Sequence, residues 1–186
     1  MSKPHIHFTI PYSFEKKLFE AYDFEMQKVA DPEDWVAFTD GDILFFPANF
    51  GHIIQSHINK HPETGMFTCY TNRIKNDIQL LSRKAWDIDS LKHHFNVAKS
   101  MQQNAAGQSY TVKGKLGGML MVMKKAVWEE VKEDIREKTQ NMKLLSVDNA
   151  ICDVLMQHNY TMRIMEDMYV LHYRRFNESK QERGME

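Results

Sequence analysis

Hydrophobic and polar residues follow two different periods along the chain, and the changes between them predict alternating strands and helices. Residues 5–10 alternate in polarity at every second position and end at Pro11, as a strand does. Ser13 is then placed to cap a helix in which apolar residues recur at helical spacing as far as Asp31. Residues 35–39 are a short uninterrupted apolar run, which is typical of a strand covered on both faces.

The middle of the chain continues this alternation. Asn49 is expected to cap a second helix, and residues 66–71 are predicted to form another buried strand. Residues 89–103 predict a third helix, and the Ala-Ala-Gly and Lys-Gly-Lys sequences that follow indicate a mobile loop over 104–116. The buried face of that third helix is expected to carry Leu91, Phe95 and Ala98.

The last third of the chain predicts two more helices and three more apolar runs. A strand is expected over 119–123, with a helix directly after it and another that begins near Ser146. Two apolar runs, 162–165 and 168–173, are separated by two acidic residues. This order predicts the α/β class, with one mixed, mostly parallel sheet flanked by helices.

Length and composition indicate one compact domain. The chain has 186 residues, and we expect the domain to span 1–176 and a polar tail to follow at 177–186. The 24 Lys and Arg balance 25 Asp and Glu, which argues against a nucleic-acid partner. Cys69 and Cys152 lie in apolar stretches and are expected in the core of a cytoplasmic protein. The longest apolar run, 117–123, is much shorter than the roughly 20 residues of a membrane-spanning helix, so no transmembrane segment is expected.

Two carboxylates follow the apolar run 35–39 directly. Gly41 separates Asp40 from Asp42, and ligands of open α/β sheets bind beyond the carboxyl ends of strands. Carboxylate oxygens are preferred ligands of Mg²⁺ and Mn²⁺, so the pair is a candidate metal site. The alternative is a plain Asp-Gly turn between two strands, with residues 45–47 as the returning strand.

Four segments together resemble the motifs of one enzyme family. Residues 34–42 resemble the strand and DxD motif of A-type-fold glycosyltransferases, particularly those of family 2. Residues 117–121 resemble the Gly-Gly motif before the acceptor-side strand, and residues 147–153 are similar to the acidic helix start that supplies the base in inverting members. Residues 169–173 look like the late strand whose histidine completes the metal site. The resemblance implies a shortened A-type glycosyltransferase fold.

The resemblance also implies a metal-dependent donor site. Asp42 and His172 would ligate Mn²⁺ or Mg²⁺, while Asp40 would help to hold the ion and reach the ribose or sugar of the nucleotide donor. A hydrogen-bonded core histidine is the alternative for His172. Arg73, at the end of the strand 66–71, is a candidate phosphate contact, with a surface arginine as its alternative.

An acceptor side is implied as well. Asp148 would take the proton of an acceptor hydroxyl, and its alternative role is to stabilise a helix start. Asp153, five residues further on, is the weaker candidate base. Gly117 and Gly118 would lie on the acceptor side, or else form a loop or bulge before a strand.

The expected function is a metal-dependent inverting glycosyltransferase, which moves a sugar from a nucleotide donor, with UDP as the expected nucleotide, to a saccharide or glycan-precursor hydroxyl. Only 39 residues precede Asp40, so no base-binding acid is assigned, and a homodimer or partner chain is a candidate to complete the donor site. The main alternative is a catalytically silent saccharide-binding or complex-forming relative. A nucleotidyltransferase is disfavoured because residues 4–13 lack glycine, and a phosphohydrolase because Leu44 follows the second acid at two residues.

Overall fold

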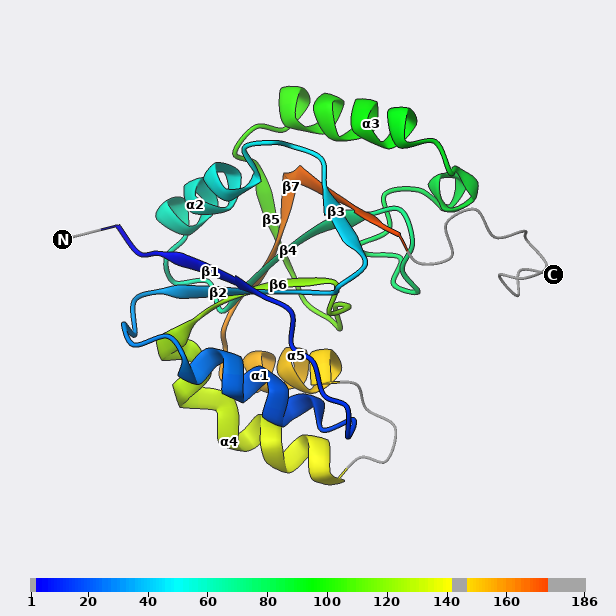
Figure 1. Cartoon of the computed structure of the whole chain (residues 1–186). Helices are drawn as coiled ribbons and strands as arrows, with labels where there is room; N and C mark the ends of the chain where they lie inside the picture. The colour runs from blue at the N-terminus through cyan, green and yellow to red at the C-terminus, as the bar shows by residue number, and fades with distance from the viewer. Residues whose placement is uncertain (1–2, 142–146, 174–186) are drawn as a thin grey trace.

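Seven strands in residues 3–141 and 147–173, the part of the chain that the computed structural model describes, form one mixed sheet with helices on both faces (Figure 1). This arrangement confirms the predicted α/β class, whereas the predicted tail 177–186 lies outside the described residues. The elements in chain order are β1 (Ile6–Thr9), α1 (Leu18–Gln27), β2 (Trp35–Thr39), β3 (Ile43–Phe45), α2 (Phe50–Lys60), β4 (Met66–Thr71), a 3₁₀ helix η1 (Arg83–Asp87), α3 (Leu91–Asn104), β5 (Ser109–Val112), β6 (Leu120–Lys124), α4 (Lys125–Asn141), α5 (Val147–Gln157) and β7 (Met162–His172).

The strand order β1-β2-β6-β4-β7-β3 decides which chain ends meet, and β5 also pairs with β7. Strands β1, β2, β4 and β7 run in one direction, because β6 is antiparallel to both β2 and β4 while β7 is parallel to β4. The sheet is therefore mixed as expected, but only β1–β2 and β4–β7 are parallel among the six pairings of the described strands. The carboxyl ends of β2, β4 and β7 share one edge of the sheet.

Apolar residues that alternate along the strands build a core on each face of the sheet. Helices α1, α4 and α5 cover one face, where Phe38 and Trp128 are fully buried, and α2 covers the other over Trp35 and Phe67 (Figure 1). Burial of one such side chain stabilises the fold by about 1.5–3 kcal/mol. The expected core positions of the two cysteines are confirmed, because both are free thiols that are completely buried.

Two strands differ from the sequence-based expectation. The predicted loop 104–116 contains β5, which pairs in antiparallel fashion with β7. The apolar runs 162–165 and 168–173 belong to one strand, β7, and the register of its pairing with β4 shifts between Cys69 and Tyr70. The two acidic residues that separate the runs therefore mark a bulge, which periodicity alone does not distinguish from a loop.

Two helices were predicted with the wrong limits or the wrong face. The Ser13 hydroxyl accepts a hydrogen bond from the Lys17 amide, but α1 begins only at Leu18 because Lys16 has a positive φ of 60°. In α3 the expected core residues Leu91 and Phe95 are about half exposed, at 49% and 51%. Ala98 is buried as expected, and the other buried position of α3 is His94.

Every helix in the described part of the chain is too short or too polar to span a membrane.

Candidate metal centre

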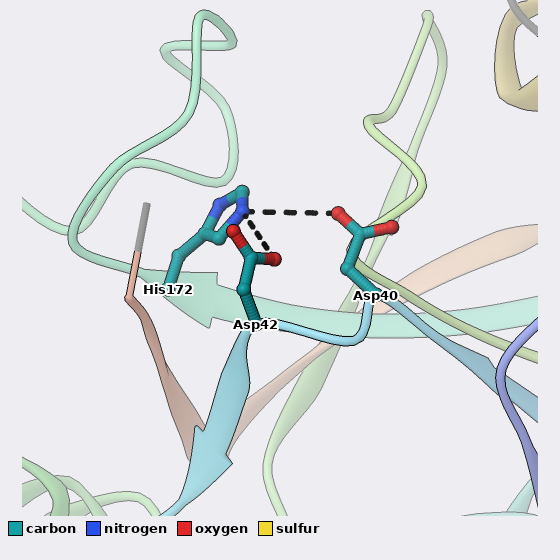
Figure 2. Close-up of side chains that lie close together, drawn as sticks. All are labelled: Asp40, Asp42 and His172. Atoms are coloured by element: carbon teal, nitrogen blue, oxygen red, sulfur yellow. Dashed lines mark ion pairs between the residues drawn. The ribbon is translucent and has the colours of Figure 1, made fainter. Parts of the chain in front are cut away.

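Three side chains predicted to bind metal converge at the shared edge of the sheet. The Nε2 atom of His172 lies 3.1 Å from an Asp42 carboxylate oxygen and 3.8 Å from an Asp40 oxygen (Figure 2). The three ligand atoms lie within 4.8 Å of one another, and no other such group occurs in residues 3–141 and 147–173. The structure thus brings together residues that are about 130 positions apart in the sequence.

The two aspartates are held on a turn between strands that are not neighbours. Strand β2 ends at Thr39. The Asp40 amide then donates a hydrogen bond to the carbonyl of Met119, the residue before β6. Strand β3 then pairs with β7, with Ile43 opposite His172, rather than returning along β2. The segment is thus a turn between two strands, as in the alternative interpretation, but the second strand pairs with β7, the strand that carries His172.

The imidazole of His172 is oriented by the backbone. Its Nδ1 atom lies 2.8 Å from the Arg73 carbonyl oxygen, which accepts only, so Nδ1 carries the hydrogen. Its backbone amide donates to the Asn72 side-chain oxygen at 2.8 Å. In the neutral form of the ring, the Nε2 lone pair therefore faces the two carboxylates. A carbonyl bonded to the second nitrogen of a metal-binding histidine is the usual way in which such a ligand is fixed.

The donor set fits a divalent cation. A lone pair on Nε2 and a carboxylate oxygen of Asp42 repel each other at 3.1 Å unless a proton or a cation lies between them. The side chain of His172 is only 9% exposed, whereas those of Asp40 and Asp42 are 46% and 47% exposed, so the site opens toward solvent on the carboxylate side. Two carboxylates and one imidazole suit Mn²⁺ better than Mg²⁺, because imidazole is a softer ligand. The open side leaves positions for oxygens of a ligand.

Asp148 and Gly118, predicted from separate motifs, are in direct contact. Asp148 is in the first turn of α5, and its Oδ2 atom accepts a hydrogen bond from the Gly118 amide at 2.9 Å. A Cβ atom on Gly118 would lie 3.2 Å from the Asp148 Cβ, so the glycine allows this close approach. The Asp148 Oδ1 atom accepts from the Asn149 amide. The carboxylate is half-buried and fixed in place at the start of β6.

Tyr22 is a buried residue of α1 whose hydroxyl is affected by the charges of both Asp40 and Asp148. Burial chiefly, and then the negative charges of Asp40 and Asp148, raise the pKa of the Tyr22 hydroxyl well above its usual range. Both carboxylates are therefore close enough to act on one phenol. Tyr22 lies on the apolar stripe of α1, so periodicity assigned it to the core, where it also packs against Phe38.

Arg73 matches neither of its two predicted roles, a phosphate contact and a surface arginine. Its side chain is only 2% exposed, its Nε atom donates to the Trp86 carbonyl at 2.9 Å, and its guanidinium forms an ion pair with Asp89. The guanidinium therefore holds η1 and the start of α3 rather than a phosphate. Arg73 reaches the candidate site through its carbonyl oxygen, which orients His172.

Gly117 and Asp153 also have structural partners. The Gly117 amide donates to the Gln79 side chain at 2.6 Å, and a Cβ there would lie 2.3 Å from the terminal methyl of Ile74, so a larger residue would require the Ile74 side chain to move. Asp153 forms ion pairs with Lys115 and Lys138, in keeping with its weaker candidacy as a base.

Comparison of the chain with models of known protein families finds no match, and comparison with curated proteins finds none either.

Proposed function

We propose that the protein is a metal-dependent inverting glycosyltransferase that moves a sugar from a nucleotide-sugar donor to a hydroxyl of a saccharide or glycan precursor. The observation that supports this most strongly is the convergence of Asp40, Asp42 and His172, with the His172 ring oriented by a carbonyl. Asp148 adds a candidate base nearby, because it accepts from the Gly118 amide while the Asp40 amide donates to the carbonyl of the next residue, Met119.

Each ligand would make a separate contribution to donor binding. His172 and Asp42 would hold Mn²⁺ or Mg²⁺, and Asp40 would complete the protein's share of the coordination. When bound, the cation would neutralise the charge that develops on the departing nucleoside diphosphate. The half-exposed carboxylates leave room for the donor phosphates on the open side of the site.

Asp148 would act on the acceptor. Its carboxylate would accept the proton of the acceptor hydroxyl as that oxygen forms a bond to the anomeric carbon. The bond between the anomeric carbon and the phosphate oxygen breaks at the same time, and its electron pair leaves with the diphosphate. Attack from the face opposite the leaving group inverts the anomeric centre. The Gly118 amide holds the Asp148 carboxylate in place during this step.

The segment between β1 and α1 would contact the donor. A Cβ atom added to Gly41, between the two aspartates, would lie 3.8 Å from the Ile10 side chain. This segment therefore borders the metal centre. Tyr12 and Phe14 are 76% and 88% exposed on it. An exposed aromatic ring beside a metal centre can stack on a nucleobase, for which UDP is the first nucleotide to test. We place the reaction in the cytoplasm, where the free thiols of the protein remain reduced.

Isothermal titration of UDP and GDP in the presence of Mn²⁺, combined with a transfer assay on the corresponding nucleotide sugars, tests the proposal. We expect Asp42→Ala to lose metal-dependent nucleotide binding. Asp148→Asn should keep that binding and lose about 10²–10⁴-fold in transfer rate, the usual contribution of a general base. Asp153→Asn, on the same helix but paired with two lysines, is the matched control and should retain both.

Two results would contradict the proposal. The first is the absence of any Mn²⁺-dependent binding of a nucleoside diphosphate to the parent protein. The second is donor binding without transfer to any saccharide, which would favour a catalytically silent saccharide-binding protein.

A further inference from the structure

A second candidate site lies between α3 and the sheet. It is a cavity of about 540 Å³, within the size range of small-molecule sites. Residues of β4, the segment that follows it, the end of α3, β5 and β7 line it, among them Tyr70, Ile78, Met101, Tyr110 and Glu166.

This cavity is separate from the metal centre but shares one segment with it. None of Asp40, Asp42, Asp148 or His172 is among its lining residues. The chain after β4 connects the two places. Its first residues hold His172 at the metal centre, and Asp77, Ile78, Leu80 and Leu81 line the cavity a few positions later. The side chain of Gln79, in the middle of this segment, bonds the Gly117 backbone next to Gly118. A ligand in the cavity would therefore lie beside the segment that positions the candidate catalytic groups.

The charged residues that line the cavity are acidic, which excludes anionic ligands from it. Its lining contains two carboxylates, Asp77 and Glu166, and no lysine or arginine. Asp77 is already paired with Arg83. The Glu166 carboxylate forms no hydrogen bond or ion pair with the residues that the structure describes, so it can accept hydrogen bonds from a ligand.

The remaining polar groups both donate and accept. The hydroxyls of Tyr70 and Tyr110 lie 3.1 Å apart, and one hydrogen shared between them leaves a second hydrogen to donate. Burial, the Tyr110 hydroxyl and the charge of Glu166 raise the pKa of the Tyr70 hydroxyl, so this phenol stays protonated at neutral pH. Asn104 adds an amide, and the side chains of Ile78 and Met101 add apolar surface.

We propose that this cavity binds a neutral saccharide, as a subsite for sugar units of the acceptor that lie away from the reacting hydroxyl. Sugar hydroxyls both donate and accept hydrogen bonds, and the C–H faces of the ring pack on apolar side chains, which matches the mixed lining. An ammonium ligand would leave the tyrosine donor unused. The proposal rests on the proposed glycosyltransferase function for the role of the sugar, and its saccharide-binding claim is tested without donor or metal.

Saturation-transfer NMR with three groups of glycan probes that differ in charge tests the proposal on the full chain, in the presence of a chelator. Neutral probes are an array of uncharged glycans that includes triacetylchitotriose; deacetylated chitotriose is the cationic probe and trigalacturonic acid the anionic one. We expect binding of one or more neutral glycans and none of trigalacturonic acid. Tyr110→Phe and Glu166→Gln should each weaken that binding, the latter by about ten-fold or more, because it removes hydrogen bonds to a charged acceptor.

Matched controls separate this site from the metal centre. Glu63→Gln, the same substitution at an exposed position outside the cavity, and Asp42→Ala should leave glycan binding unchanged. The proposal is overturned if no neutral glycan on the array binds, if chitotriose binds more tightly than its acetylated form, or if neither cavity variant weakens binding. Glycan binding that persists when nucleotide binding fails would uphold the cavity and contradict only the proposed transferase.

Discussion

At the scale of single residues, the orientation of His172 carries more information than its distance from the acids. A histidine beside a carboxylate is often a simple ion pair. Here the Arg73 carbonyl takes the hydrogen of Nδ1, so in the neutral form of the ring the nitrogen that faces Asp42 is the one with the lone pair. The expectation of a buried, hydrogen-bonded histidine is confirmed, because the residue is only 7% exposed, and its role as a metal ligand stays a prediction.

Gly118→Ala tests whether the position of Asp148 matters. The new Cβ would lie 3.2 Å from the Asp148 Cβ, so the carboxylate must shift by a few tenths of an ångström. We expect about a ten-fold or greater loss of transfer rate, because small displacements of a reacting group have large effects on rate. Nucleotide binding in the presence of Mn²⁺, measured by titration, should remain.

Gly51→Ala is the control for that substitution. Gly51 lies in α2, and a Cβ there would meet no atom within 4 Å. Its replacement should raise the free energy of unfolding by about 1 kcal/mol through helix propensity and leave transfer unchanged. Equal transfer rates in both alanine variants would show that the contact between Gly118 and Asp148 has no role in the reaction.

At the scale of secondary-structure elements, α3 is attached to the sheet by a polar contact that hydrophobic periodicity does not reveal. The ring of the buried His94 contacts the Tyr169 hydroxyl and the Ile88 carbonyl, each at 2.7 Å. Burial, as the largest cause, lowers the pKa of His94 below its ordinary value of 6.5. The helix is therefore held by a neutral imidazole.

The attachment of α3 predicts a pH dependence of stability. Because the folded state resists protonation of His94, the unfolded state binds more protons below pH 6.5, and stability is lost as the pH falls. We expect the free energy of unfolding to fall by up to about 1.4 kcal/mol per pH unit between pH 6.5 and 5. Denaturant titrations of the parent and of His94→Gln across pH 7.5–5 measure it. Parallel curves for the two proteins would contradict the prediction.

Strands with strong local patterns were predicted well, and strands that depend on one partner were not. Strand β2 is an unbroken apolar run that is buried at all five positions, so its limits were predicted from sequence. Strand β3 has three residues and β5 has four, and both are strands because β7 pairs with them. A sequence pattern reports which side chains are buried, whereas these strands are defined by hydrogen bonds to a distant segment.

At the scale of the whole molecule, the grouping of Asp40, Asp42 and His172 was expected from the resemblance, and the strand order explains how it forms. Asp40, Asp42, Asp148 and His172 were identified from their motifs, but only the strand order places β2 and β7 so that their ends meet. Tyr22 was missed because a core aromatic and a site aromatic have the same spacing in a helix. The roles predicted for Arg73 were wrong because its partners, Trp86 and Asp89, follow it by 13 and 16 residues in a segment without a regular hydrophobic pattern.

Binding of Mn²⁺ should stabilise the entire domain, since its ligands come from segments far apart in the chain. At a concentration 100 times the dissociation constant, the gain is about 2.7 kcal/mol, or roughly 5–10 °C in Tm for a domain of this size. Thermal unfolding followed by circular dichroism, with Mn²⁺ or with a chelator, measures this shift. His172→Ala should abolish the shift, and an equal shift in both proteins would show that Mn²⁺ binds elsewhere.

The position of β7 in the sheet has a consequence for the synthesis of the protein. Among the described strands it is made last, yet it lies between β4 and the two strands β3 and β5 that pair only with it. Before β7 emerges from the ribosome, the edge of β4 is therefore exposed. Strands β3 and β5 have no pairing partner at that stage. Such a nascent chain also lacks the histidine of the candidate site. The sheet and the Asp40, Asp42 and His172 cluster can therefore form only after β7 has been synthesised.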